Sequence, residues 1–199
     1  MGSHIVVAGA GIIGLATAYE VARRGYRVTV VDKEDSVAAH QSGRSMGVIH
    51  SGVSYPPGSL RSTLGRAGAA SIVEFARAHG VAVDVCGKLI VATREAEIPR
   101  LEELQHRGKA QGLPTRLLSA AEAREFEPEV ACVAALRVAS TGIIDFPAVC
   151  AALARAIEKF GGEVRLGVAV TALRRLTNGL RVTTTDGLLS AHHFIACCG

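Results

Sequence analysis

Residues 5–32 read IVVAGAGIIGLATAYEVARRGYRVTVVD. A short apolar run leads directly into the pattern Gly9-x-Gly11-x-x-Gly14. An amphipathic segment follows, and a second β-branched run ends on Asp32. Apolar runs of this length are typical of buried strands, and the segment between them has helical spacing. The order strand, glycine turn, helix, strand predicts the first unit of a parallel α/β sheet.

Each part of this stretch suits a nucleotide diphosphate. The glycines allow a tight turn, a close backbone approach and helix–sheet packing, while the helix start offers free N–H groups and a positive dipole end. A carboxylate about 20 residues further on accepts hydrogen bonds from ribose hydroxyls and repels a 2′-phosphate, so FAD and NAD both fit and NADP does not. A βαβ unit that binds no nucleotide is the alternative. The cofactor-binding residues predicted in this stretch are Gly9, Gly11, Ile13, Gly14, Asp32 and Lys33.

The composition is typical of an α/β protein with a sizeable core. Of 199 residues, 49% are hydrophobic and 22 are glycine, and the net charge of +4 is spread without a basic run. We therefore expect no nucleic-acid partner, and no apolar run is long enough for an integral membrane span. Five cysteines without a C-x-x-C pattern predict no metal site and indicate a reducing, cytoplasmic setting. The first strand starts so early that no signal peptide is expected.

The rest of the chain predicts a two-part architecture. A long loop rich in Gly, Ser and His covers residues 35–55, and Ser59 then caps a helix that ends at Gly80. A mixed α+β region follows, with a capping box at Ser119 and Glu122.

The C-terminal part returns to β-structure after a helix that starts at Asp145. Three strands joined by Asn-Gly and Asp-Gly turns are expected at residues 169–176, 180–185 and 189–196. We expect the last strand to rejoin the first sheet, with the vicinal Cys197-Cys198 packed at its end. The expected domain segments are 1–80, 81–141 and 142–199.

Three further segments carry a family resemblance. Residues 40–60 read HQSGRSMGVIHSGVSYPPGSL, residues 86–93 read CGKLIVAT, and residues 140–146 read STGIIDF. Together with the glycine turn, these segments resemble the L-2-hydroxyglutarate dehydrogenase/oxidase family of D-amino-acid-oxidase-like flavoproteins. The resemblance covers essentially the whole chain, although Met46 stands where a small serine is usual. Family members are considerably longer, so the chain resembles their N-terminal half.

The resemblance implies both a fold and an activity. The implied fold is a glutathione-reductase-type, FAD-binding, Rossmann-like α/β fold with a β-meander and part of an inserted α+β substrate domain. The implied reaction is FAD-dependent oxidation of a small L-2-hydroxy acid, such as L-2-hydroxyglutarate, by hydride transfer to flavin N5. Electrons would pass to O₂ or to a membrane quinone, which leaves open a peripheral association with the inner membrane. The alternatives are an amino-acid or N-methyl-amine oxidase of the same fold and a non-catalytic nucleotide-binding fragment.

The remaining candidate residues lie mostly in the loop and beyond it. Backbone N–H groups around Ser42 to Ser45 predict an anion nest to which Arg44 adds charge, with a solvated loop as the alternative. His40 is expected either to bind flavin covalently, as in some related amine-oxidising flavoproteins, or to hydrogen-bond. His50 is the candidate base, or else a core histidine. The further predicted contacts are Gly43, Gly47, Val170 (through its backbone, by the resemblance) and Gly199 for the cofactor, and Tyr55, Arg61 and Lys88 for substrate carboxylates.

Overall fold

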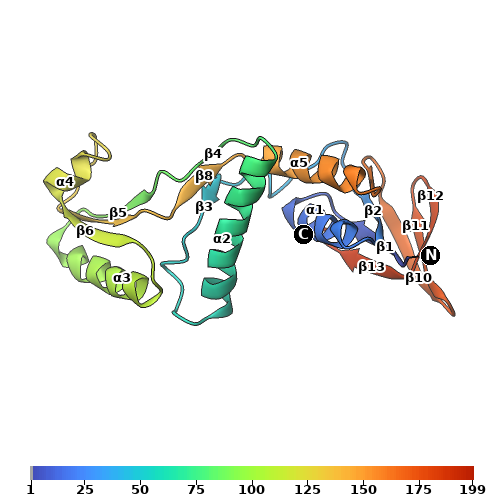
Figure 1. The fold of residues 1–199 in the computed structure, drawn as a ribbon, viewed down its shortest axis with the longest axis horizontal. Coiled ribbons are helices and arrows are strands. Elements are labelled where there is room, and N and C mark those ends of the chain that lie inside the picture. The colour runs from blue at the N-terminus through green and yellow to red at the C-terminus, as the bar shows by residue number, and fades with distance from the viewer. Residues whose placement is uncertain (1) are drawn as a thin grey trace. The chain divides into compact units, whose positions relative to one another are not determined.

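The computed structural model describes residues 2–199, which form two compact units (Figure 1). The first unit comprises Met1–Met46 and Asp145–Gly199, and the second comprises Gly47–Ile144. The boundary expected after residue 80 is therefore corrected, because the chain leaves the first unit at Met46. The reason is strand pairing: β3 (Val48–Ile49) pairs with β8 (Gly142–Ile144), which commits the chain after Met46 to the second unit.

A four-stranded parallel sheet is the centre of the first unit. Its order is β13-β1-β2-β9, with β1 at His4–Ala8, β2 at Arg27–Val31, β9 at Glu163–Arg165 and β13 at His193–Ala196. Every residue of β1 is buried. A strand buried on both faces needs a continuous apolar run rather than alternation, which is what residues 5–8 supply. The predicted parallel α/β fold is confirmed.

Two helices pack beside this sheet. α1 (Ile12–Arg23) packs against α5 (Phe146–Lys159). Its buried residues are Gly14, Leu15, Ala18 and Ala22, and the three small ones allow neighbouring elements to approach the helix closely. α5 begins as expected, since the Asp145 carboxylate accepts the Ala148 N–H at 3.0 Å. Its buried face includes Val149, Leu153 and Ile157.

The predicted meander is present as β10 (Val170–Leu176), β11 (Gly179–Thr184) and β12 (Gly187–Ala191). The single strand expected over residues 189–196 is wrong: it is two strands that break at His192. β12 pairs antiparallel with β11, whereas β13 pairs parallel with β1. The His192 N–H donates to the His4 carbonyl at 2.8 Å, where the chain passes from one sheet to the other. The last strand thus rejoins the first sheet as expected.

The second unit contains two three-stranded sheets and four helical segments. β3 and β4 (Val83–Asp84) flank β8, and β5 (Lys88–Ala92) and β6 (Thr115–Ser119) flank β7 (Ala134–Val138). β6 has no counterpart among the predicted strands. The helices are α2 (Leu60–Ala78), η1 (Glu95–Glu97), α3 (Ile98–Ala110) and α4 (Ala120–Arg124).

Two predicted helix caps are confirmed in this unit. The Ser59 hydroxyl accepts the Ser62 N–H at 3.2 Å, and a reciprocal capping box joins Ser119 and Glu122. Across residues 2–199, no helix is both long and apolar enough to cross a membrane. The same residues contain no group of three or more His, Cys, Asp or Glu side chains arranged to hold a metal ion.

Candidate functional site

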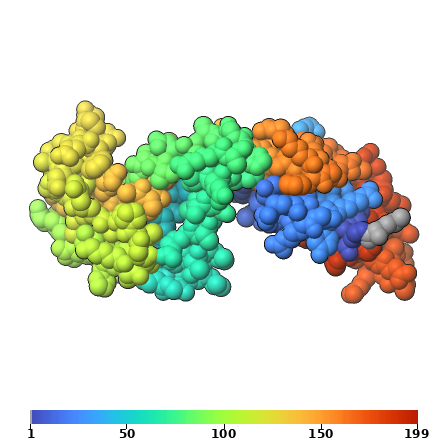
Figure 2. Space-filling view, viewed as in Figure 1, coloured from blue at the N-terminus to red at the C-terminus, as the bar shows by residue number. Residues whose placement is uncertain are grey.

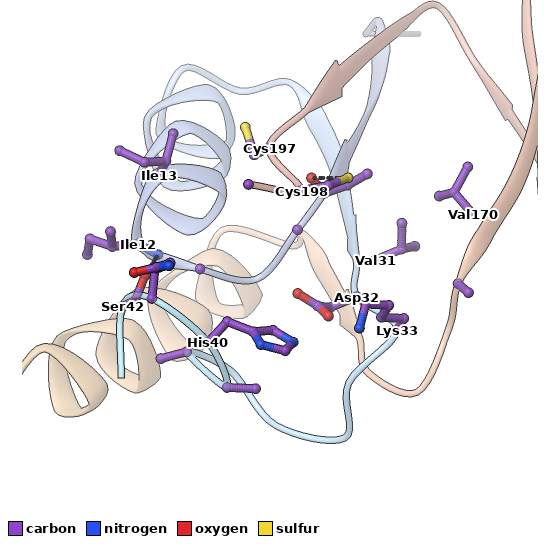
Figure 3. A pocket seen from close by; sticks show the side chains of 18 of the residues that line it. Ile12, Ile13, Val31, Asp32, Lys33, His40, Ser42, Val170, Cys197 and Cys198 are labelled. Atoms are coloured by element: carbon purple, nitrogen blue, oxygen red, sulfur yellow. Dashed lines mark hydrogen bonds between the residues drawn. The ribbon is translucent and has the colours of Figure 1, made fainter. Parts of the chain in front are cut away.

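A pocket of about 320 Å³ lies in the first unit at the carboxyl ends of β1, β2 and β13 (Figure 3). Carboxyl ends of parallel strands are where open α/β sheets bind their ligands. The pocket brings together nine predicted cofactor residues: Gly9, Gly11, Ile13, Asp32, Lys33, His40, Ser42, Val170 and Gly199. Segments that are far apart in the sequence therefore meet at one site.

Gly9 sits where the strands converge. Its φ of +112° is in the region that favours glycine, and its N–H donates to the Val31 carbonyl at 2.8 Å. A Cβ at this position would lie 2.2 Å from the Cys197 carbonyl oxygen, so no side chain fits. A Cβ on Gly14 would lie 1.9 Å from the Gly9 oxygen, which explains the close approach of α1 to the turn.

The loop after β2 closes over the start of α1. The Ser42 hydroxyl accepts the Ile12 N–H at 2.9 Å, and the Ala38 N–H donates to the Ala10 carbonyl at 3.0 Å (Figure 3). Ser42 thus caps α1 from a distant position, because the N-cap residue itself is glycine. The other N–H groups of the first helical turn have no partner within the helix, so the positive end of the helix dipole lies next to the pocket.

The Asp32 carboxylate is fixed by two backbone groups. Its Oδ2 accepts the Ala10 N–H at 2.6 Å, and its Oδ1 accepts the Glu34 N–H at 2.9 Å. A carboxylate has about four acceptor positions, so these bonds orient it and leave acceptors for ribose hydroxyls. Asp32 therefore holds the glycine turn as well as facing the pocket.

His40 is engaged by Glu34 at the rim of the pocket. Its Nε2 lies 2.9 Å from Glu34 Oε1, and Lys33 pairs with the same carboxylate. The hydrogen bond from Lys33 and then that from His40 hold the pKa of Glu34 below its usual range. These pairs are largely exposed, and exposed ion pairs contribute little to stability.

Cys197 and Cys198 form the wall behind the glycine turn. Cys197 is half-buried, and burial raises the pKa of its thiol above the usual value. Cys198 is exposed rather than packed, with its Sγ 3.6 Å from the Ala8 carbonyl oxygen. Their position at a strand end was predicted, but their place in the lining of the pocket was not. The expected return of the last strand to β1 was the available signal.

Five predicted cofactor residues do not line this pocket. Gly14 lies beneath it, and Gly43 holds the loop turn, since a Cβ there would lie 2.3 Å from the Ala38 carbonyl. Arg44 and Ser45 are exposed beyond the lining, and Gly47 belongs to the second unit.

The predicted catalytic and substrate residues all lie in the second unit. His50 is exposed just after β3, and Arg61 is exposed on α2. Tyr55 is half-buried, and its carbonyl accepts the Gln111 Nε2–H at 3.2 Å. Lys88 is half-buried at the start of β5, where burial lowers the pKa of its ammonium group.

Fold and pocket together define an α/β protein built to bind a dinucleotide. The sequence profile of the FAD dependent oxidoreductase family matches residues 4–199. The chain belongs to this family of FAD-dependent oxidoreductases.

Several similar curated proteins are named L-2-hydroxyglutarate dehydrogenase. The protein from Indibacter alkaliphilus is 36% identical over 202 residues, which cover 100% of this chain and 51% of the relative. That from Escherichia coli K12 is 36% identical over 98% of this chain and 47% of the relative. The human mitochondrial protein is 39% identical over 80% of this chain and 35% of the relative. The chain thus spans at most about half the length of these curated relatives.

Two solved oxidases share the fold. Glycine oxidase from Geobacillus kaustophilus superposes with a TM-score of 0.89 at 24% identity over 99% of this chain and 56% of that chain. L-alpha-glycerophosphate oxidase from Mycoplasma pneumoniae, solved with FAD bound, gives 0.85 at 27% identity over 98% of this chain and 52% of that chain.

The pocket is compatible with the family's cofactor. A side chain on Gly11 would occupy space in the pocket, and the N-terminus of α1 offers its dipole to a diphosphate. Asp32 supplies a fixed acceptor for a ribose, and Val168 with Val170 supplies apolar surface for a base.

Proposed function

We propose that this chain is the FAD-binding and part of the substrate-binding region of an enzyme that oxidises an L-2-hydroxy acid. The substrate favoured is L-2-hydroxyglutarate, with 2-oxoglutarate as product. The electron acceptor would be O₂ or a membrane quinone, the latter reached by peripheral contact with the membrane. The observation that carries the proposal is the 36–39% identity to proteins named L-2-hydroxyglutarate dehydrogenase over most of the chain.

The chemistry that FAD supplies in such an enzyme is acceptance of a hydride at N5 from the substrate Cα. Gly9, Gly11 and Ser42 would position the diphosphate, and Asp32 would bind the ribose next to them. These four residues belong to one unit, so the binding half of the proposal depends on that unit alone.

Residues of the second unit would serve the substrate. His50 would accept the hydroxyl proton, because an imidazole changes protonation near neutral pH. Tyr55, Arg61 and Lys88 would provide hydrogen bonds and positive charge for the two carboxylates. A half-buried ammonium without an ion-pair partner among residues 2–199 makes Lys88 the strongest of these candidates, since a bound carboxylate would offset its desolvation.

A second candidate is a nucleotide-binding fragment without turnover. It is favoured by one observation, namely that the chain spans 51% or less of its curated relatives. Glycine oxidase shares the fold, but a likeness at 24% identity does not favour an amine substrate.

The test starts from the purified 199-residue chain titrated with FAD. Flavin absorbance that co-elutes with the protein, and is lost in a Gly11→Val variant that keeps the wild-type urea midpoint, supports the binding site. Colour that remains after acid precipitation would assign a covalent link, with His40→Ala as its control.

Anaerobic addition of L-2-hydroxyglutarate to the FAD-loaded chain then separates the candidates. Loss of the oxidised-flavin absorbance with the L isomer, but not with the D isomer or glycine, supports the proposed reaction. Bleaching by glycine would assign the amine-oxidase alternative. Bound but unreactive FAD supports the fragment, and failure to bind FAD or ADP overturns all three.

A further inference from the structure

A second pocket, of about 440 Å³, lies entirely within the second unit. It occupies one face of the β5-β7-β6 sheet beside the segment that follows α4. In Figure 2 the surface is hollowed between the yellow residues of that segment and the green residues that precede β5. Its apolar wall is formed by Leu89, Val91 and Val130.

Arg137 is the cation of this pocket. Its guanidinium carbon lies 4.3 Å from the centroid of the Phe126 ring. A guanidinium over an aromatic ring is attracted to its face, and its N–H groups can donate to a carboxylate. Among residues 2–199, Arg137 makes no ion pair.

A second guanidinium lies on the same face of the sheet. Strand register places Arg137 directly opposite Arg116 on β6, and directly paired residues share a face of the sheet. Arg116 is neutralised by Glu122, with 3.5 Å between Nη2 and Oε1. Of these two guanidinium groups, that of Arg137 is therefore the one available to an anion.

Two other charged groups border the pocket. Lys88 lines the pocket at the start of β5, but strand alternation assigns its side chain to the face that carries Ile90 and Ala92, which belong to the core under α3. Glu127 lines the pocket, and its carboxylate would repel a second negative charge on the same ligand. The site therefore combines one available cation, an apolar wall and one repelling carboxylate.

We infer that this pocket binds a small aliphatic monocarboxylate, with the carboxylate on Arg137 and the alkyl chain against Leu89, Val91 and Val130. The pocket is separate in sequence and in unit from the dinucleotide site, and the inference does not depend on the proposed function. Because Glu127 disfavours a second carboxylate, the ligand of this pocket differs in charge from the dicarboxylate L-2-hydroxyglutarate.

The test is an NMR titration of the ¹⁵N-labelled chain with sodium valerate at constant ionic strength. The Arg137 Nε–Hε resonance should shift saturably, with a dissociation constant on the order of 1 mM, as expected for so small a ligand. Acetate, which lacks the alkyl chain, and 1-pentanol, which lacks the carboxylate, should each bind several-fold more weakly. Glutarate should bind more weakly than valerate in the wild type and gain affinity in Glu127→Gln.

Variants locate the site. Arg137→Gln should weaken valerate binding about tenfold or more, as expected for the loss of a charged hydrogen-bonded pair. The matched control Arg116→Gln, which removes the opposite guanidinium, should change binding less than twofold. Arg137→Lys keeps the charge but not the planar fork and should lie between them, which preserves the test if Arg137→Gln does not fold. Absence of saturable shifts, or equal effects of the variants at positions 116 and 137, would overturn the inference.

Competition with L-2-hydroxyglutarate tests the preference for a single carboxylate. L-2-hydroxyglutarate that displaces valerate from the Arg137 resonance at an equal or lower concentration would contradict the proposed role of Glu127. Valerate that binds without such competition supports that role. In both cases the effect of Arg137→Gln tests the site itself.

Discussion

Replacing Asp32 should damage the fold of the first unit before any nucleotide is bound. Its carboxylate accepts two backbone N–H groups, from Ala10 at 2.6 Å and from Glu34 at 2.9 Å. Hydrogen bonds to a charged group contribute roughly 1.5–3 kcal/mol each. Asp32→Asn keeps one acceptor but turns an amide donor toward the other N–H, so we expect a loss of about 2 kcal/mol. Asp32→Ala loses both bonds and should cost about 3–5 kcal/mol, a large share of a typical free energy of unfolding.

Urea unfolding of the chain without ligand measures this cost, and amide hydrogen exchange localises it. The amides of Ala10 and Glu34 should lose protection in both variants, while those of the β5-β7-β6 sheet should not. Asp35→Asn is the matched control, because Asp35 is exposed and no ion pair or hydrogen bond to its carboxylate is seen within residues 2–199. An Asp32→Ala variant with wild-type urea midpoint and protected Ala10 and Glu34 amides would refute the reasoning.

Three other changes have distinct expected outcomes. Gly14→Ala brings a Cβ to 1.9 Å from the Gly9 oxygen, so calorimetry should show destabilisation by roughly 1–3 kcal/mol or more, and FAD titration should show loss of binding. Ser42→Ala removes the acceptor of the Ile12 N–H and should cost about 1 kcal/mol in urea unfolding, with restoration by Ser42→Thr. Burial lowers the pKa of the Lys88 ammonium group, so the unfolded state binds this proton more tightly than the folded state does. Desolvation of the charged group therefore destabilises the fold at pH 7, and this cost is relieved as the pH rises to the pKa of the unfolded state. Lys88→Met should therefore raise Tm at pH 7 and flatten the dependence of Tm on alkaline pH, and an unchanged Tm would contradict this.

The order of elements in the first unit could be predicted because its signals are local. The apolar runs around the glycine turn specify buried parallel strands, and Asp145 and Asn178-Gly179 mark a helix start and a hairpin turn. The break at His192 could not be predicted in the same way. Residues 189–196 form one β-prone run, and only pairing with two different strands divides it.

The boundary between the two units at Met46 could not be predicted, because it depends on a pairing between strands that lie far apart in the sequence. Val48 and Ile49 form a strand of two residues, too short to distinguish from a loop by periodicity. Their partner is β8, more than 90 residues further along the chain, and this pairing moves α2 into the second unit. Arg137 was missed for a related reason, since its neighbours Phe126 and Arg116 come from different elements.

The first two glycines of the turn have separable physical roles that the motif alone does not reveal. Gly9 is required by the protein itself, because its φ is +112° and a Cβ would strike the Cys197 carbonyl of the neighbouring strand. Gly11 is less constrained internally, since its Cβ would meet only the Ser42 hydroxyl, at 3.2 Å. A side chain at Gly11 would therefore occupy ligand space more than it would strain the fold. The strand packing that demands Gly9 brings the carboxyl ends of β1, β2 and β13 to one point, and that convergence creates the pocket.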